Sequence, residues 1–415
     1  MLMIPPRLKI NSERLLTNFE ELSKIGATRL GGVARVALSS EDLQARTWLA
    51  ERVEEYGFEV RDDAVGNLGG ILLSRNPQAK TLLLGSHLDT NPNGGKYDGS
   101  IGVLAALECM KTLQEADMDL PFHVEVVDFT DEEGSWQSLF GSMGLTGTLR
   151  DEHIYDSKFD NAAFRAALLR LGLFASELKT AKRDPSTLLA YLELHIEQGD
   201  QLDRDGVDIG VVTRIVGRSS FVITFHGEAV HAATNIMRKR DALQGATCFM
   251  NWIYGLPYDV EGGMVNCGKI DVQPGVITIV PSQATVHMEV RHADDAQLAL
   301  MESRVIELAE RCARDYQLTL TSQRILHRSV AHMNETLLQH IEEICDQHAY
   351  SHTRLYSLAG HDAQILAPFT PSAMIFIPCK DGVSMNPREY TDWHNVENGA
   401  SVMLHTILQL AESMA

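Results

Sequence analysis

The sequence predicts an α/β protein with a mostly parallel sheet, interrupted by a smaller α+β domain. Strands alternate with helices over residues 1–212, a pattern typical of a parallel sheet covered by helices. Alternating strands and long helices replace this pattern over residues 213–329, and the first pattern returns over residues 330–415. We therefore expect one α/β domain built from both ends of the chain, with the smaller domain inserted between its two parts.

The first part of the α/β domain is expected to begin with a helix over residues 41–57. Its apolar residues recur at helical spacing, and it stops at Gly57, a residue favoured at helix ends. Residues 57–73 then alternate and turn like a β-hairpin. Three short apolar runs predict buried strands: residues 81–86, 121–130 and 188–196. A helix is expected over residues 102–113.

The inserted domain has a different pattern. Two alternating segments predict its strands: residues 218–228 and 284–294. Two longer segments predict its helices: residues 238–256 and 295–316. A helix over 334–348 and an apolar strand over 371–379 then resume the α/β pattern.

Composition narrows the class of protein. The formal charge of −20 disfavours nucleic acid and anionic membranes as partners. No apolar run reaches 18 residues, so we expect no membrane-spanning helix, and the N-terminus does not resemble a secretory signal. The six cysteines are scattered without a CxxC pair, which favours a reducing compartment, the cytoplasm, over a disulfide or Cys-zinc framework.

Side chains of the kinds that bind metal follow three of the predicted strands. They are His87, Asp89 and Asp98; then Asp131, Glu132 and Glu133; then Glu193, His195 and Glu197. Because ligands gather beyond the carboxyl ends of strands in open α/β sheets, we expect these clusters to converge. Imidazole and carboxylate groups suit a divalent cation of the Zn, Mn or Co kind.

The spacing within the clusters suggests how the work is divided. His87 and Asp89 lie on the same side of an extended chain, so Asp89 is expected to hold the second ring nitrogen of His87. Asp98 can loop back to bridge two ions. Of the adjacent Glu132 and Glu133, one can bind metal while the other acts as general base. Each motif alone also fits a solvated turn or strand, and their joint occurrence favours a metal site.

The chain resembles the metal-dependent amidohydrolases that include N-carbamoyl-L-amino-acid hydrolases, β-ureidopropionases and allantoate amidohydrolases, within the M20 group of di-metal peptidases and acylases. The likeness covers nearly the whole chain and is carried by long motifs: GSHLDTNPNGGKYDGSIGVLAALE, DFTDEEGS, ELHIEQGDQL and GHDAQILAP. It implies an M20-type catalytic domain and a lid domain that forms a homodimer.

The resemblance also implies a role for each site residue. The implied metal ligands are His87, Asp98, Glu133 and His195, with Asp98 bridging two ions. The implied catalytic residues are Glu132 as the base, Asp89 beside His87, and His231 stabilising the tetrahedral intermediate, reaching across the dimer. The implied substrate contacts are Gln198, Thr278, Arg291 and His361, with Arg291 gripping a carboxylate.

The sequence departs from the family pattern at several positions. Met385 stands where the last histidine of the second metal site is usual, and a thioether is a soft, weak ligand, so we expect that ion to bind weakly or be absent. His394 is an alternative ligand. The loop HAATNIM after His231 is altered, Thr278 replaces an asparagine, and Asn91 replaces a valine.

We therefore expect metal-dependent hydrolysis of a C–N bond in an N-carbamoyl or related N-acyl amino-acid-like substrate that carries a carboxylate. The cofactor is expected to be one or two ions of Zn, Mn, Co or Ni. An allantoate-type amidohydrolase or an N-acyl or N-formyl amidase is an alternative, favoured by Thr278. A family member that has lost catalysis and serves in binding is a second alternative, supported by Met385 alone.

Overall fold

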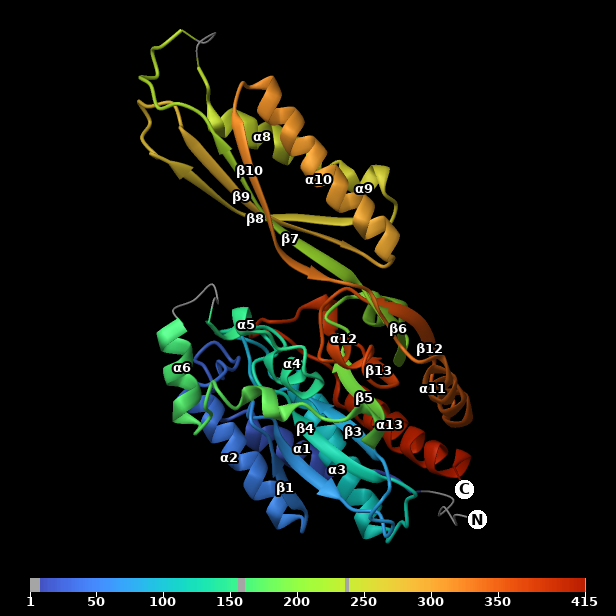
Figure 1. Ribbon diagram of the computed structural model, residues 1–415. Helices are drawn as coiled ribbons and strands as arrows, with labels where there is room; N and C mark the ends of the chain where they lie inside the picture. Colours follow the sequence, from blue (N-terminus) through green and yellow to red (C-terminus); the bar gives the residue numbers. More distant parts are fainter. Residues whose placement is uncertain (1–7, 156–160, 236–238, 415) are drawn as a thin grey trace. The chain divides into compact units, whose positions relative to one another are not determined.

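The protein consists of two compact units in the computed structural model, which describes residues 8–155, 161–235 and 239–414. The larger unit comprises Met1–Thr213 and His332–Ala415, and the smaller unit comprises Arg214–Ala331 (Figure 1). The larger unit is thus discontinuous in sequence, and the smaller unit is an insertion.

A nine-stranded sheet forms the centre of the larger unit. Its strands are β1 (Glu59–Asp62), β2 (Leu68–Leu72), β3 (Thr81–Ser86), β4 (His123–Asp128), β5 (Leu188–Ile196), β6 (Ile209–Ile215), β11 (Ala331–His332), β12 (His352–Ser357) and β13 (Ser372–Ile377). The order is β1-β2-β4-β3-β5-β13-β6-β11, and β12 also pairs with β6. The four central strands β4, β3, β5 and β13 are parallel, whereas β2 and β6 join them antiparallel. The predicted α/β class is therefore confirmed.

Both faces of the central parallel strands are covered. Every residue of β4 and β13 is buried, as are nearly all residues of β3 and β5. Such short apolar runs without alternation are typical of parallel strands between two helical layers. The helix α3 (Ser100–Glu115) packs on β3, β4 and β5, and α13 (Trp393–Ser413) packs on α3 and β13.

The other helices of the larger unit are α1 (Ser12–Leu22), α2 (Ser40–Glu55), α4 (Phe140–Thr146), α5 (Asp151–Tyr155), α6 (Asn161–Arg170), α7 (Gln201–Asp205), α11 (Glu335–His348) and α12 (Ala363–Leu366). The predicted helix over 41–57 is α2. The Ser39 side chain accepts the N–H of Asp42 and caps its start, and Gly57, with a φ of 82°, follows its end.

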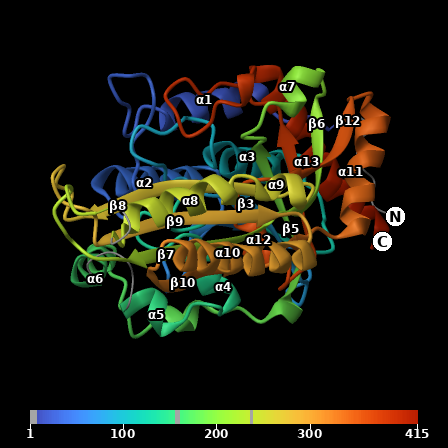
Figure 2. The same ribbon diagram turned by 90° about the horizontal axis from the view of Figure 1, so that it is seen from above.

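The smaller unit is a four-stranded antiparallel sheet with helices on one face. Its strands are β7 (Gly217–His226), β8 (Met264–Gln273), β9 (Gln283–His292) and β10 (Thr319–Arg328), in the order β10-β7-β9-β8. Its helices are α8 (Ala242–Ile253), α9 (Leu256–Asp259) and α10 (Asp295–Asp315). Figure 2 shows α8 and α10 side by side over the sheet.

Buried and half-buried residues alternate along β7 and along much of β9, which explains why the helices cover one face of this sheet. Every second residue of β7 is buried, so its apolar face packs against the helices. The core is formed by residues of β7, β9, α8 and α10: Phe221, Ile223, Phe225, Val286, Val290, Phe249, Met301 and Val305 among others. Within the described part of the chain, no helix is both long enough and apolar enough to cross a membrane.

The register of the central sheet positions the candidate site. Ser86 at the end of β3 is paired with Asp128 at the end of β4. His195, near the end of β5, is paired with Phe376 of β13. Because these strands are parallel, their carboxyl ends lie at one edge of the sheet, and the segments that follow them start from neighbouring positions.

Candidate metal centre

His87 follows directly after β3 and is 2% exposed. Its Nδ1 lies 2.9 Å from the main-chain carbonyl oxygen of Asp89, to which it donates. In the neutral ring, Nε2 is then the unprotonated nitrogen, and it faces Asp98, with Oδ1 at 3.6 Å. The fixed ring therefore offers a lone pair to the space beside Asp98.

His195, in β5, presents the same arrangement from the neighbouring strand. Its Nδ1 donates to the carbonyl oxygen of Ile196 at 2.8 Å, and its Nε2 lies 3.1 Å from Asp98 Oδ1. The N–H of Gly99 donates to this Nε2 at 3.1 Å. Gly99 has a φ of 63°, and a Cβ there would lie 2.4 Å from the His87 ring, so no other residue fits between the turn and that imidazole.

Asp98 links the two imidazoles. Oδ1 faces both Nε2 atoms, and the ligand atoms of His87, Asp98 and His195 all lie within 4.8 Å of one another. All three residues are buried. Two imidazole nitrogens and a carboxylate oxygen that converge in this way fit a divalent cation of the Zn or Mn kind.

The electrostatics of the centre favour a positive charge. Burial acts to lower the pKa of His87, but Glu132, Asp98 and Asp89 outweigh it and hold that pKa well above its ordinary value. Burial likewise acts to raise the pKa of Asp98, but the neighbouring imidazoles of His195 and His87 hold it well below its usual value. Buried carboxylates outnumber the cationic groups that face them, and a divalent cation would balance this charge.

The acidic turn after β4 lies against the same centre. Glu132 is 8% exposed, and its Oε2 lies 3.7 Å from His87 Nε2. Burial raises the pKa of Glu132 well above its usual value. The carboxylate of Asp89 accepts the N–H groups of Glu132 and Glu133, at 3.2 and 3.3 Å, and so fixes the turn.

This contact changes the expected role of Asp89. Its carboxylate lies 3.7 Å from His87 Nδ1, and the hydrogen bond to the ring goes to its carbonyl oxygen instead. The carboxylate is turned away because the two N–H groups of the acidic turn compete for it. Asp89 therefore holds His87 through its backbone and the acidic turn through its side chain.

Three acids of the sequence clusters accept hydrogen bonds that stabilise the turns and strands around the site. The carboxylate of Asp131 accepts three N–H groups of its own turn, from Ser135, Trp136 and Gln137. Glu197 accepts the N–H groups of Gln201 and Leu202 at the start of α7. Glu193 accepts hydrogen bonds from Ser86, Tyr191 and Ala363, so although it forms a second close group with His195 and His361, its oxygens are already engaged.

Two of the predicted substrate contacts lie beside the ligand group. Gln198 donates through Nε2 to Asp98 Oδ2 at 2.7 Å, while its buried Oε1 has no hydrogen-bond partner among the described residues. The His361 ring lies 4.5 Å from the His195 ring and is held by Ser357 through Nε2, at 2.9 Å. Burial lowers the pKa of His361 well below its usual value, so this ring is neutral.

Glu389 was not predicted as a site residue. Its Oε1 accepts the N–H groups of Tyr97 and Asp98, at 2.8 and 3.0 Å, and its Oε2 accepts the Met385 N–H at 3.1 Å and lies 3.1 Å from the Ser384 hydroxyl. It thereby joins two turns far apart in sequence. The one local signal was a carboxylate four residues after Met385, within the motif used to find that position.

The predicted second-metal position has a different character. Met385 is 49% exposed, and its φ of 52° places it in the left-handed region. Neither close ligand group among the described residues includes Glu133. His394 is exposed in the first turn of α13 and belongs to neither group.

The remaining predicted residues lie in the smaller unit. His231 is exposed and bridges Ile279, and the N–H of Ala232 donates to the carbonyl oxygen of Thr278 at 2.9 Å. Arg291 is near the other end of β9, where its guanidinium pairs with Glu289 at 2.7 Å. Residues 236–238 of the altered loop lie outside the described residues.

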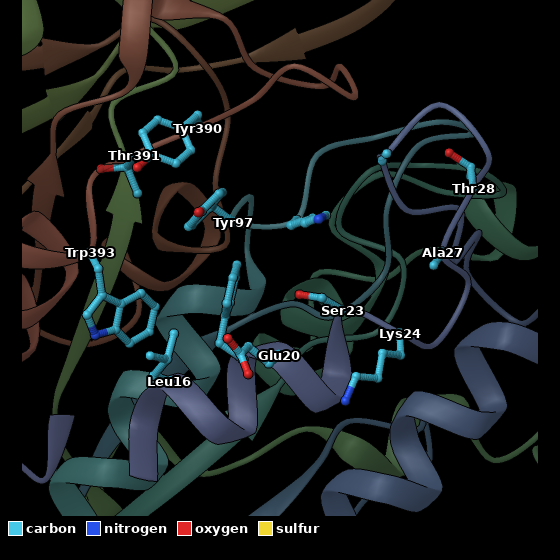
Figure 3. A pocket seen from close by; sticks show the side chains of 14 residues that line it. Leu16, Glu20, Ser23, Lys24, Ala27, Thr28, Tyr97, Tyr390, Thr391 and Trp393 are labelled. Carbon is cyan, nitrogen blue, oxygen red and sulfur yellow. The ribbon is translucent and has the colours of Figure 1, made fainter. Parts of the chain in front are cut away.

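A cavity of about 520 Å³ lies in the larger unit behind the Asp98 turn. Tyr97, Tyr390 and Trp393 line one side of it, and Lys24, two residues after the end of α1, also lines it (Figure 3). The Phe19 ring lies tilted against two of them, with ring centres 4.6 Å from Tyr97 and 5.6 Å from Trp393. None of the predicted site residues lines this cavity.

The fold and the buried ligand group together define a two-unit α/β protein with a candidate centre for a divalent cation. Residues 83–409 match the model of peptidase family M20/M25/M40, and the chain belongs to this family. The resemblance inferred from the sequence motifs is therefore confirmed.

Relatives of similar length are known for this chain. It is 34% identical over 406 residues to an N-carbamoyl-L-amino acid amidohydrolase of Geobacillus stearothermophilus, covering 97% of this chain and 99% of that protein. It is 29% identical to an allantoate amidohydrolase of Bacillus subtilis, covering 97% and 99%. The crystal structure of an amidase of the hydantoinase/carbamoylase family from Burkholderia multivorans superposes with a TM-score of 0.86, at 33% identity, over 98% of this chain and 99% of that one.

Proposed function

We propose that the chain is an amidohydrolase that cleaves the C–N bond of an N-carbamoyl amino acid, or of a related N-acyl compound, and releases the free amino acid. The observation that carries the proposal is the buried group of His87, Asp98 and His195 with Glu132 beside it. Two relatives named N-carbamoyl-L-amino acid amidohydrolase, at 34% and 32% identity, support it.

The ligand group would hold a single Zn, Mn, Co or Ni ion through His87, Asp98 and His195. When bound, such a cation polarises a carbonyl group and lowers the pKa of water. Glu132 accepts the proton of the attacking water and passes it to the leaving nitrogen. The raised pKa of this buried carboxyl suits a group that must both take up and release a proton.

Other residues would recognise the substrate. The free Oε1 of Gln198 accepts an N–H of the ureido group, because its Nε2 is already fixed on Asp98. The neutral His361 lines the same region. Arg291 grips the carboxylate, and His231 stabilises the oxyanion, an effect worth about 3–4 kcal/mol.

The geometry of the smaller unit supports a homodimer. The strand β9 begins at Gln283, close to the Thr278 turn and its neighbour His231, whereas Arg291 is eight residues further along the strand. At about 3.4 Å per residue, this separates the two groups by about 27 Å. One copy of this rigid sheet cannot present both to one small substrate, so we infer that a second chain supplies one of them.

For an N-carbamoyl substrate, one water is consumed, and the products are the amino acid, ammonia and carbon dioxide. The test is a panel of N-carbamoyl, N-formyl and N-acetyl amino acids together with allantoate, assayed on one preparation of known metal content. Glu132→Gln should lower kcat by about 10²–10⁴-fold with the metal content unchanged. Glu51→Gln, on the exposed face of α2, is the control. Full turnover by Glu132→Gln would remove Glu132 as the base.

Allantoate is the second candidate substrate. Relatives named allantoate amidohydrolase, from Bacillus subtilis and Escherichia coli, are 29% and 32% identical to this chain. Turnover of allantoate in preference to every N-carbamoyl amino acid would favour it. All six cysteines are free thiols, which fits the proposed cytoplasmic location.

A further inference from the structure

We propose that this chain works with one divalent cation, because Met385 offers no suitable ligand for the second cation of di-metal family members and neutral donors from Asn91 and Gln198 hold the acids expected beside it. The inference rests on the proposed function for the role of the first cation. It concerns the oxygens of Asp98 and Glu133 and the side chain of Met385.

Both oxygens of Asp98 already have partners. A bridging carboxylate must give one oxygen to each cation. Oδ1 of Asp98 faces His87 and His195, whereas Oδ2 accepts the amide of Gln198 at 2.7 Å. The Ser384 hydroxyl lies 3.0 Å from this Oδ2 and 3.1 Å from Glu389 Oε2, and its one proton serves one of the two oxygens. The Gln198 donor is neutral, and it occupies one of the two lone pairs of Oδ2.

Glu133 is held in the same way. Its Oε2 accepts the side-chain amide of Asn91 at 2.8 Å, and its backbone N–H donates to Asp89. The donor N–H of Asn91 stabilises the Glu133 carboxylate where a cation otherwise would. The valine expected at this position from the family pattern could not make this contact.

Met385 is a poor ligand for a second cation. A soft thioether does not match a hard, oxygen-rich site, and this side chain is half exposed. Its N–H is fixed on Glu389 Oε2 at 3.1 Å, so the turn is well anchored while its side chain offers no suitable ligand. One oxygen of Asp98 and one oxygen of Glu133 thus accept neutral donors, and Met385 offers no suitable ligand.

The test counts cations without measuring turnover. The full-length protein is stripped with a chelator, titrated with Mn²⁺, and examined by elemental analysis and electron paramagnetic resonance. We expect one Mn²⁺ per chain and the signal of an isolated ion. Two tightly bound Mn²⁺ per chain with an exchange-coupled signal would overturn the proposal.

Variants test the named donors. The double variant Asn91→Val with Met385→His should bind a second Mn²⁺ and show the coupled signal, whereas Asn386→His, on the neighbouring half-buried residue, should stay at one. If the double variant does not fold, Met385→His alone serves, because its site is half exposed and histidine tolerates a positive φ. A count of one in the folded variants would show that these residues do not exclude the second ion.

The outcomes are separable from those of the proposed function. Absence of turnover on the whole substrate panel would defeat the proposed function and leave the cation count unaffected. A count of two with normal turnover would defeat only this inference.

Discussion

The carboxylate of Glu389 accepts the main-chain N–H of Asp98 at 3.0 Å, across 291 positions of the chain. The same side chain holds the Met385 turn. Two segments that the smaller unit separates in sequence are therefore tied together at the candidate ligand.

Glu389→Gln should weaken this connection. Glutamine has one acceptor oxygen where the carboxylate has two, so its amide would face N–H or O–H donors that remain buried. We expect a loss of about 2–4 kcal/mol in the free energy of unfolding and a 10–100-fold loss in Mn²⁺ affinity. Burial raises the pKa of Glu389 to about 7, so urea unfolding and titration calorimetry belong at pH 8, where the carboxylate is ionised. Glu412→Gln, at an exposed position near the end of α13, is the control. Equal values for both variants would show that Glu389 does not hold the Asp98 and Met385 turns together.

Asp98→Asn should remove the charge that joins the two imidazoles. We expect Mn²⁺ affinity to fall at least about 100-fold, because the amide is a weaker ligand and its N–H₂ group can face the cation. Titration calorimetry measures the change. Asp346→Asn, at a side chain that is 77% exposed, should bind Mn²⁺ as the unmodified protein does. Undiminished affinity in Asp98→Asn would remove Asp98 from the ligand set.

Removal of the cation should affect both activity and stability. Chelation should abolish turnover, and added Mn²⁺ or Zn²⁺ should restore it. Because the ligands converge only in the folded chain, a cation at 100 times its Kd should add about 2.7 kcal/mol to the free energy of unfolding. Thermal melts with and without Mn²⁺ measure this, and equal melting temperatures would argue against a folded-state site.

Asp63 predicts a pH dependence that is independent of the metal centre. Burial raises its pKa to about 6, although it accepts the N–H groups of Val65 and Asn67 and the Asn67 amide. A carboxyl whose pKa is raised on folding binds its proton more tightly in the folded state, so its contribution to stability is lost as pH rises through 6. Between pH 5 and 7.5 this amounts to about 1.4 kcal/mol.

The measurement is the free energy of unfolding of the metal-free protein at the two pH values. Asp63→Asn should be less stable than the unmodified protein at both pH values, because it loses one acceptor. Between pH 5 and 7.5, its free energy of unfolding should fall by about 1.4 kcal/mol less than that of the unmodified protein. An equal slope for both proteins would show that Asp63 titrates normally.

Arg291 and Glu289 form a partly buried ion pair that should influence substrate affinity. Arg291→Lys should raise KM for substrates with a carboxylate about tenfold, because lysine cannot bind it in the bidentate manner. Glu289→Gln should lower KM, since it removes the negative charge that pairs with the guanidinium at 2.7 Å and would repel a substrate carboxylate. Arg304→Lys, in a surface pair with Glu307, is the control. If the Arg291 and Glu289 changes move KM in the same direction, Arg291 does not contact the carboxylate.

Much of the fold could be predicted from local patterns. The strands β3, β4, β5 and β13 stand out because their apolar runs are buried on both faces. The edge strands β8 and β10 of the smaller unit were not predicted, because most of their residues are exposed and show no clean alternation.

The candidate site was predictable to a similar degree. His87 and His195 lie at strand ends, and that position is itself a signal. The contacts of Asp98 with Ser384 and Glu389 could not be inferred, because they join turns nearly 300 residues apart and depend on the tertiary fold. The choice between the carbonyl and carboxylate oxygens of Asp89 also depended on contacts with another turn.

The place of β13 in the sheet has a consequence for synthesis. β13 lies between β5 and β6, so a growing chain on the ribosome leaves one edge of β5 open until residue 377 has been made. At about 5–20 residues per second, translation from residue 197 to residue 377 takes roughly 10 to 35 s. A premature stop codon between residues 197 and 377 would leave the edge of β5 unpaired. Such a chain would pair with strands of other chains and form aggregates rather than a shortened enzyme.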